Sequence, residues 1–437
     1  MGIFKLAKQK GIEDLELYTS ISTKKDINIF NGSLESYQIS DQHLLSVRGI
    51  INGKIGYVYT EDLEYSKDAL LNKLIDNANI VASEDVEEIF AGSDKYVDLG
   101  EDPKVKENTY EEIMAMLNLA KQTARIYDKR VTDVSVSYSE TSSEKRINNT
   151  KGLDLEKDSN FFMFTINVVA SVEDQKTSAW DYQIVKSFSE FKPEEIAIEA
   201  AKTSISELGA NPCSSGVYPV ILKNSASTSI LSAVSGMFYA EGVQKGMSPL
   251  KEKLNTKIVG DNITIVDDPF HKDGINRTAF DDEGVATSVT NRIENGKLNS
   301  YLYNLKSAKI DNVESTGNGF KGSIQSKVGT SASNLYIKEG TNSFDSLFEG
   351  IEKGVYITKL SGTHAGINNI NGDFSLQSQG FMIENGKITK PIRLITTAGN
   401  FFEMLSNVDK LADDLKFDYN GVGSPSLLIK ELPISGK

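Results

Sequence analysis

The stretch Leu15-Glu16-Leu17-Tyr18-Thr19-Ser20-Ile21-Ser22 alternates in the manner of a β-strand with one buried face. Downstream, Asn31-Gly32 and Asn52-Gly53 are dipeptides that two-residue hairpins prefer. Further strands are therefore expected over residues 26–30, 44–47 and 55–59, and a helix within residues 61–83, where apolar side chains recur at helical spacing. The start of the chain predicts antiparallel hairpins with a flanking helix.

A second unit of the same kind follows a linker, for which residues 91–108 are suited by their Gly, Pro and many charges. Its first helix is expected over residues 110–127, where the apolar side chains form one stripe. Strands are expected over residues 131–138, 145–149, 161–173 and 177–184, and a closing helix over residues 193–207.

The rest of the chain is rich in short strands broken by Gly and Asn. It begins after Asn211-Pro212 with a strand over 217–222 and a helix over about 225–241. Two echoing segments, 293–297 and 383–387, both read Ile-Glu-Asn-Gly-Lys and predict two similar hairpins; convergent turn chemistry and a true duplication both account for them. The fold class is therefore α+β. The domains are expected at 1–105 and 106–210, both α+β units, and at 211–437, a large β-rich C-terminal domain.

Charge and cysteine content exclude several classes of protein. The 437 residues include 47 Lys and Arg against 61 Asp and Glu, a net charge of −14. This argues against a nucleic-acid groove, which needs clustered basic side chains, and against docking on anionic lipid. The single cysteine, Cys213, excludes an intrachain disulfide. No signal-peptide core and no run of roughly 18 apolar residues is present, so we expect a cytoplasmic protein without nucleic-acid or membrane partners.

Few residues carry obvious chemistry. The three histidines lie far apart, and HExxH, HExxxH and CxxC motifs are absent, so a standard zinc site is not encoded. Residues 317–322 match GxGxxG, but a strand or loop follows where a dinucleotide site needs a helix. Asp281-Asp282-Glu283 could hold a cation or share a proton, or could be solvated turn acids. His364 lies between glycines, where it could donate a hydrogen bond to a ligand in a cleft or be structural.

Several blocks of the second half occur together in a family-specific order. They are Phe-Asp-Asp-Glu-Gly-Val-Ala-Thr at 280–287, Ser-Thr-Gly-Asn-Gly at 315–319, Asn-Gly-Asp-Phe-Ser at 371–375 and Gly-Phe-Met-Ile-Glu-Asn-Gly-Lys at 380–387. Through them the chain resembles the TldD/PmbA family of peptide-processing proteins, formerly called modulators of DNA gyrase. The resemblance covers residues 212–437 well and residues 1–210 only in general layout.

In that family, one branch is a zinc metallopeptidase with a helical HExxxH motif and a cysteine in a C-terminal Gly-rich loop. The other branch, TldE or PmbA, lacks these residues. Aligned on the motif, Ser232 replaces the first His, Ala233 the Glu and Met237 the second His. The cysteine loop is also missing, because Phe417–Gly423 leads directly into Ser424. The resemblance therefore implies the TldE/PmbA branch, with no catalytic or metal-binding residue in this chain and degenerate positions at 232, 233 and 237.

The resemblance implies a non-catalytic subunit that forms a peptide-enclosing chamber with a TldD-like HExxxH partner, which alone would carry zinc. Whether the chain has any activity of its own is left open. An extended, unfolded peptide would bind by strand addition. Candidate chamber-lining residues are His364, Asp281, Asp282, Glu283, Asn318 and Asp373. One alternative is a homo-oligomeric module, such as a homodimer, that binds a peptide or ligand without hydrolysis. Another is an enzyme that uses His364 with Asp373, or the acidic cluster.

Overall fold

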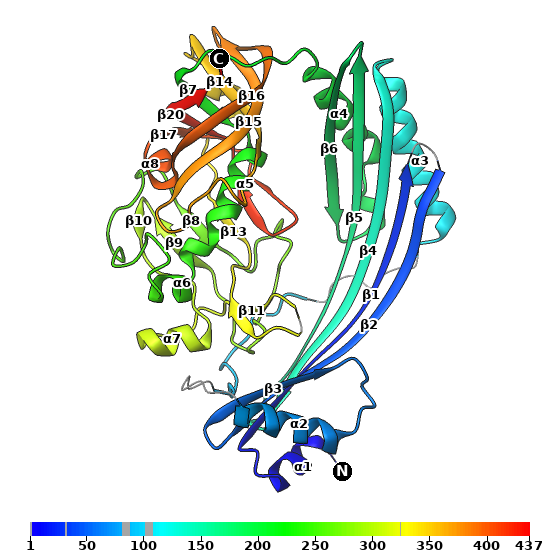
Figure 1. The fold of residues 1–437 in the computed structure, drawn as a ribbon, viewed down its shortest axis with the longest axis vertical. Helices are drawn as coiled ribbons and strands as arrows, with labels where there is room; N and C mark the ends of the chain where they lie inside the picture. Colours follow the sequence, from blue (N-terminus) through cyan, green and yellow to red (C-terminus); the bar gives the residue numbers. More distant parts are fainter. Residues whose placement is uncertain (1, 31–32, 81–87, 101–107, 324) are drawn as a thin grey trace. The chain divides into compact units, whose positions relative to one another are not determined.

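A computed structural model describes residues 2–30, 33–80, 88–100, 108–323 and 325–437. The described residues fall into two compact units (Figure 1). The first comprises Met1–Gly92, Gly100–Gly209 and Gly322–Lys327. The second comprises Ser93–Leu99, Ala210–Lys321 and Val328–Lys437. The expected three-domain division, with boundaries near residues 105 and 210, stays a prediction.

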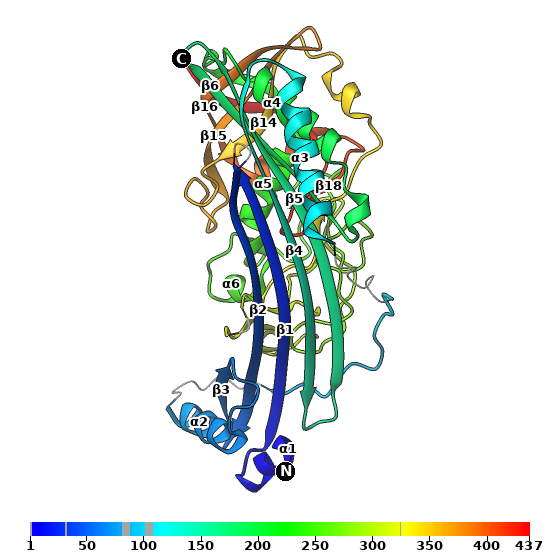
Figure 2. The same cartoon turned by 90° about the vertical axis from the view of Figure 1, so that its right-hand side faces the viewer.

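The first unit is built on one antiparallel six-stranded sheet in the order β3-β2-β1-β4-β5-β6 (Figure 2). Its elements are α1 (Ile3–Gln9), β1 (Asp14–Phe30), β2 (Ser33–Ile51), β3 (Lys54–Thr60), α2 (Lys67–Ile80), α3 (Tyr110–Tyr127), β4 (Val131–Asn149), β5 (Asp154–Val172), β6 (Gln175–Val185), η1 (Phe188–Glu190) and α4 (Pro193–Ser206). The hairpins of both expected N-terminal units belong to this sheet, because β1 pairs with β4 as well as with β2.

Alternation along the strands explains which face of this sheet is covered. On β4, Val134, Val136 and Tyr138 are buried, while the residues between them are only partly so. These side chains form one core with the apolar stripe of α3 and with small residues of α4. Thr109 fixes the start of α3 through a capping box: its hydroxyl accepts from the backbone N–H of Glu112, whose carboxylate accepts in return from Thr109.

The strands of the first unit are longer than the sequence pattern indicates. Residues 15–22 and 26–30, expected as two strands, are one strand, β1. The exposed Lys24 interrupts the apolar alternation but not the backbone pairing, because it faces Ser40 of β2 and Thr141 of β4. A strand paired on both sides keeps its hydrogen-bond ladder whatever its side chains.

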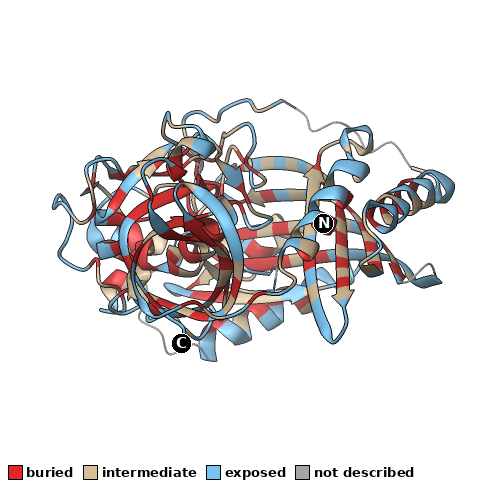
Figure 3. Cartoon of the chain, turned by 90° about the horizontal axis from the view of Figure 1, so that it is seen from above, coloured by how far each residue is buried: buried red, intermediate tan, exposed pale blue. Residues whose placement is uncertain are grey.

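The second unit contains two six-stranded sheets and a small hairpin (Figure 1). One sheet has the order β10-β9-β8-β13-β19-β18. The other has the order β16-β15-β14-β7-β20-β17, and β16 also pairs with β20, so this sheet curves back on itself. Many residues along its strands are buried (Figure 3). The elements are β7 (Gly216–Leu222), α5 (Asn224–Val234), η2 (Ser235–Phe238), α6 (Ala240–Gln244), β8 (Ile265–Asp267), β9 (Thr290–Glu294), β10 (Lys297–Leu298), α7 (Leu305–Asp311), β11 (Gly319–Lys321), β12 (Val328–Thr330), β13 (Leu335–Ile337), η3 (Phe344–Phe348), β14 (Lys353–Ser361), β15 (Asp373–Glu384), β16 (Lys387–Asn400), α8 (Phe401–Ser406), β17 (Val408–Leu411), β18 (Lys416–Phe417), β19 (Val422–Ser424) and β20 (Leu427–Ser435).

The predicted Asn-Gly hairpins of this unit are confirmed. Asn295 and Gly296 join β9 to β10 with φ values of 47° and 80°, and Asn385 and Gly386 join β15 to β16 with 51° and 73°. Positive φ at both central residues is the type I′ signature. The expected Asn31-Gly32 turn lies outside the described residues. The α+β class is confirmed, and none of the helices in the described part of the chain has the length and apolar character needed to cross a bilayer.

Candidate functional site

The segment that the resemblance assigns to the family's zinc-binding helix is not one helix. The expected continuous helix over 225–241 is wrong: α5 ends at Val234, a tight 3-10 turn follows, and α6 begins only at Ala240. The hydroxyl of Ser235 donates to the carbonyl of Ser232 at 2.9 Å, and the exposed Gly236 follows it. A serine hydroxyl that hydrogen-bonds to a backbone carbonyl of the preceding turn, followed by a glycine, lowers the helix propensity at this point.

The side chains at the three aligned positions do not fit zinc. Ser232 and Ala233 are half-buried at the end of α5, whereas Met237 is buried in the main core of the unit. A hydroxyl is a poor zinc ligand, a methyl group cannot take a proton, and a thioether is too soft to hold zinc well. Among the described residues, no three His, Cys, Asp or Glu side chains form a group that could hold a metal ion.

The C-terminal segment that the resemblance compares with the family's cysteine loop is a tight turn between β18 and β19. The Asp418 carboxylate accepts from the backbone N–H groups of Asn420 and Val422, at 2.8 and 3.0 Å. Burial raises the pKa of Asp418, and these backbone hydrogen bonds oppose the rise. The turn therefore closes on itself around a carboxylate.

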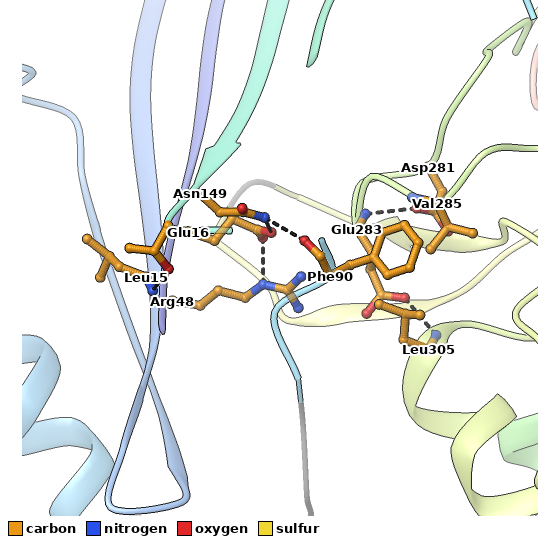
Figure 4. A network of polar contacts seen from close by, with 10 residues as sticks. Leu15, Glu16, Arg48, Phe90, Asn149, Asp281, Glu283, Val285 and Leu305 are labelled. Carbon is orange, nitrogen blue, oxygen red and sulfur yellow. Dashed lines mark hydrogen bonds and ion pairs between the residues drawn. The ribbon is translucent and has the colours of Figure 1, made fainter. Parts of the chain in front are cut away.

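Asp281 is the centre of a buried acidic cluster (Figure 4). Its Oδ1 accepts from the backbone N–H groups of Glu283 and Val285, both at 2.9 Å, and its Oδ2 accepts from that of Gly319 at 2.8 Å. Burial raises its pKa well above 3.8, the nearby charge of Glu283 raises it further, and the backbone donors oppose both effects. This carboxylate holds the turn at residues 281–285 against the start of β11.

The neighbouring acids make similar contacts with the backbone. Asp282 Oδ2 accepts from the N–H of Lys321 at 2.9 Å, and Glu283 Oε2 accepts from that of Leu305 at 2.8 Å, which is the first residue of α7. A carboxylate at a helix N-terminus is favoured by the helix dipole. Gly319 leaves room for Glu283, because a Cβ at this glycine would lie 2.4 Å from Glu283 Oε2.

Asn318 links this cluster to a buried charge pair. Its amide donates to Asp267 Oδ2 at 2.7 Å. Burial raises the pKa of Asp267, whereas the positive charge of Arg292 and the Asn318 hydrogen bond oppose the rise. Arg292 is itself fully buried on β9, and burial lowers its pKa to about 10. Its guanidinium donates to the hydroxyl of Ser300 and the carbonyl of Tyr301.

The structure thus brings together Asp281, Asp282, Glu283 and Asn318, all buried in the second unit. His364 and Asp373 are exposed instead, in the loop before β15 and at the start of that strand. The Asp373 carboxylate accepts from the side-chain amides of Asn371 and Asn400. Within the described ranges, His364 makes no side-chain hydrogen bond or ion pair, so it is not paired with Asp373. The role of all six as chamber-lining residues stays a prediction.

The GxGxxG stretch forms a hairpin, as its sequence context indicates. Gly319–Lys321 is β11 and pairs with β12, which is the next element among the described residues, where a dinucleotide site would need a helix. Sequence reasoning missed Arg292, because the buried acid that faces it is on a different strand and no local pattern marks the pair.

The first unit contains a separate buried ion pair (Figure 4). Arg48 Nε lies 2.6 Å from Glu16 Oε1, and both side chains are almost fully buried. Asn149 donates to the second carboxylate oxygen of Glu16 at 3.4 Å and to the carbonyl of Phe90 at 2.7 Å. This pair connects β1, β2 and the end of β4, and it has no arrangement that suggests catalysis.

Three family models match the chain in consecutive segments. They are described as PmbA/TldA metallopeptidase domain 1, matched by residues 15–79, the central domain, matched by residues 103–208, and the C-terminal domain, matched by residues 215–436. The C-terminal model alone matches half of the chain.

Individual relatives are similar over nearly the whole length. "Uncharacterized protein MJ0231" of Methanocaldococcus jannaschii is 30% identical over 423 residues, 94% of each chain. A solved structure from Thermotoga maritima, described as a modulator of a DNA gyrase, has a TM-score of 0.92 at 32% identity and covers 99% of this chain and 98% of its own. The structure of TldE from Thermococcus kodakarensis has a TM-score of 0.91 at 22% identity, with 99% of both chains covered, which shows a shared fold.

Proposed function

Because the chain belongs to the PmbA/TldD family of metallopeptidase-like proteins, we propose that it is the non-catalytic TldE/PmbA-like subunit of a two-subunit metallopeptidase. Its partner would be a TldD-like chain with the HExxxH motif, and the pair would process or degrade unfolded peptides. In this assembly the partner supplies zinc and the general base, and this chain shapes the peptide-enclosing chamber and limits access to it.

The observation that carries the proposal is the chemistry of the aligned metal positions. Ser232, Ala233 and Met237 replace two ligands and the base, and Met237 is committed to the hydrophobic core. The closed turn at Asp418 supports the same conclusion, because it provides no cysteine in place of the third ligand. A chain of this family without these groups needs a partner to hydrolyse peptides.

The described side chains suggest how this subunit contributes. His364 and Asp373 are exposed and uncommitted to a buried network, which supports a place on the chamber wall. Asp281 and Glu283 use their oxygens to fix loop backbone, which supports a role in keeping the wall rigid. A peptide bound by strand addition is held through its backbone hydrogen bonds, so binding would depend little on its side chains.

Native purification of the tagged chain from its own cells tests the proposal. We expect an HExxxH relative in equal amount by mass spectrometry, and zinc that stays with that relative when the subunits are separated. The double variant Ser232→Ala, Met237→Leu should leave the zinc content of the complex unchanged, whereas replacing both histidines of the partner's motif should remove it.

Other outcomes of this purification would overturn the proposal. Recovery of the chain alone, self-associated and free of zinc, would favour the homo-oligomeric peptide-binding module. Zinc that stays with this chain, and is lost in the double variant, would show that positions 232 and 237 belong to a metal site. Peptidase activity of the isolated chain that disappears in His364→Ala would support an independent enzyme.

A further inference from the structure

A cavity opens on the curved sheet of the second unit, and none of its lining residues is among the candidate site residues described above. It has a volume of about 400 Å³ and is lined by Ser361, Gln377, Ser378, Gln379, Arg393 and Leu394. These residues come from the end of β14, the middle of β15 and the middle of β16. A volume of this order lies within the range of sites for small ligands.

Two irregularities in the strand pairing flank this cavity. Between β15 and β16 the register shifts, so that Gln379 faces both Arg393 and Leu394. On the other edge of β15 the register shifts again, and Thr358 of β14 is the extra residue. Bulges interrupt the hydrogen-bond ladder and redirect side chains, and they are common beside binding sites.

Leu394 is strained at this point. Its φ is +56°, a left-handed conformation that favours glycine, and its apolar side chain is 63% exposed. Because the Leu394 side chain is exposed to solvent, burial in the hydrophobic core does not offset the cost of this backbone strain. Such outliers concentrate where a ligand is held.

Arg393 supplies the charge of the cavity. Across the described ranges, its guanidinium makes no hydrogen bond or ion pair, and no acidic side chain lines the cavity. The remaining polar lining is neutral and comprises Ser361, Gln377, Ser378 and Gln379. A single guanidinium matches the charge and fork geometry of one carboxylate, whereas a phosphate dianion would call for more positive charge.

We propose that this cavity binds the free C-terminal carboxylate of a peptide. Arg393 pairs with the carboxylate, the side-chain amides of Gln377 and Gln379 face peptide groups, and Leu394 contacts an apolar side chain of the ligand. The choice of a peptide among carboxylates rests on the proposed function, and the site would hold one end of the peptide rather than cleave it.

Binding of a defined peptide to the isolated full-length chain tests this assignment without any partner. The probes are N-acetyl-Ala-Leu-Leu with a free carboxylate and the same peptide amidated at its C-terminus, measured by isothermal titration calorimetry. We expect saturable binding of the free acid and about 10- to 100-fold weaker binding of the amide, because a charge-assisted hydrogen-bond pair is lost.

Variants separate a specific site from general attraction. Arg393→Gln should lose affinity for the free acid to the level of the amide, and Arg393→Lys should be intermediate, because a lysine cannot form the bidentate pair. Lys390→Gln removes the same charge from an exposed position on the same strand, outside the cavity, and should leave binding unchanged. Circular dichroism melting curves confirm that each variant is folded.

Several results would overturn the assignment: no saturable binding, equal affinity for acid and amide, or an equal loss in Lys390→Gln. Displacement of the peptide by inorganic phosphate at a lower concentration than by acetate would show a phosphate site instead. Because no partner is present in the assay, failure here leaves the subunit proposal standing, and absence of an HExxxH partner leaves this assay valid.

Discussion

The backbone N–H of Gly319 donates a hydrogen bond to Oδ2 of Asp281 at 2.8 Å and joins the start of β11 to the turn at residues 281–285. The carboxylate also accepts from the backbone N–H groups of Glu283 and Val285, and among the described residues no cationic side chain pairs with it. Neutral donors only partly replace water around a buried charge. This explains why the pKa of Asp281 is raised despite its hydrogen bonds.

Asp281→Asn should change how the free energy of unfolding depends on pH. The native pKa lies above 3.8, so the stabilising contribution of Asp281 is fully present below about pH 3.8 and is lost as pH rises through the native pKa. In that window the wild type should lose up to about 1.4 kcal/mol per pH unit relative to the variant. A second, pH-independent effect lowers the free energy of unfolding of the variant by about 1–3 kcal/mol. It arises because the amide nitrogen of the asparagine cannot accept a hydrogen bond from the Gly319 N–H.

Urea unfolding of both proteins at several pH values between 4.5 and 7.5 measures this difference. Asp158→Asn, at an exposed strand position, serves as the control for the loss of a carboxylate. A flat difference for Asp281→Asn would contradict a raised native pKa at this residue.

Gly319→Ala should destabilise the second unit by about 1–3 kcal/mol, the usual cost of overpacking. Its added Cβ would lie 2.4 Å from Glu283 Oε2, which is itself held by the N–H of Leu305. Gly329→Ala on the paired strand β12 is the matched control, because a Cβ there meets nothing within 4 Å. Equal melting temperatures for the two variants would show that the glycine is not required for packing.

The buried pair of Glu16 and Arg48 should show strong coupling. Arg48→Met removes the cation 2.6 Å from a buried carboxylate and should cost about 3–5 kcal/mol. The double variant Glu16→Leu, Arg48→Met should recover much of this loss, because no buried charge is left unpaired. Chemical unfolding of the wild type, both single variants and the double variant gives a double-mutant cycle, which measures the interaction energy between the two side chains. Additive losses would mean that the two side chains act independently.

The sequence predicted those features that depend on local chemistry. The α3 helix was predicted from its apolar stripe, and the Asn385-Gly386 turn from residues that tolerate positive φ. The continuity of β1 through Lys24 could not be read in this way, because it depends on pairing with β2 and β4. Tertiary pairing overrides local pattern in such strands.

The site was predictable only in part, for the same reason. The acidic run at Asp281 was visible, and its similarity to a known family indicated that it matters. The end of α5 at Val234 and the burial of Arg292 were not, because each depends on what packs around it. The cavity beside Arg393 is flanked by two bulges in the strand pairing, and both involve Gln379. The spacing of apolar residues in the sequence does not reveal where a bulge occurs.

Met237 should behave as a core residue and not as part of a metal site. It is 1% exposed and belongs to the main hydrophobic cluster of the second unit. Met237→Ala should therefore cost about 2–5 kcal/mol in unfolding free energy, whereas Met237→Leu, which keeps the volume, should cost less than about 1.5 kcal/mol. Ser232→Ala, at a half-buried helix position, should stay within about 0.5 kcal/mol of the wild type.

These values come from urea unfolding of the isolated chain, and the same variants are then used to measure zinc in the purified complex. Met237→Leu and Ser232→Ala should leave zinc content unchanged, because neither side chain is suited to bind it. A loss of zinc in either variant, with stability unaffected, would assign position 232 or 237 to a metal site. A Met237→Ala variant as stable as the wild type would mean that the turn after α5 is loosely packed and that Met237 is not a core residue.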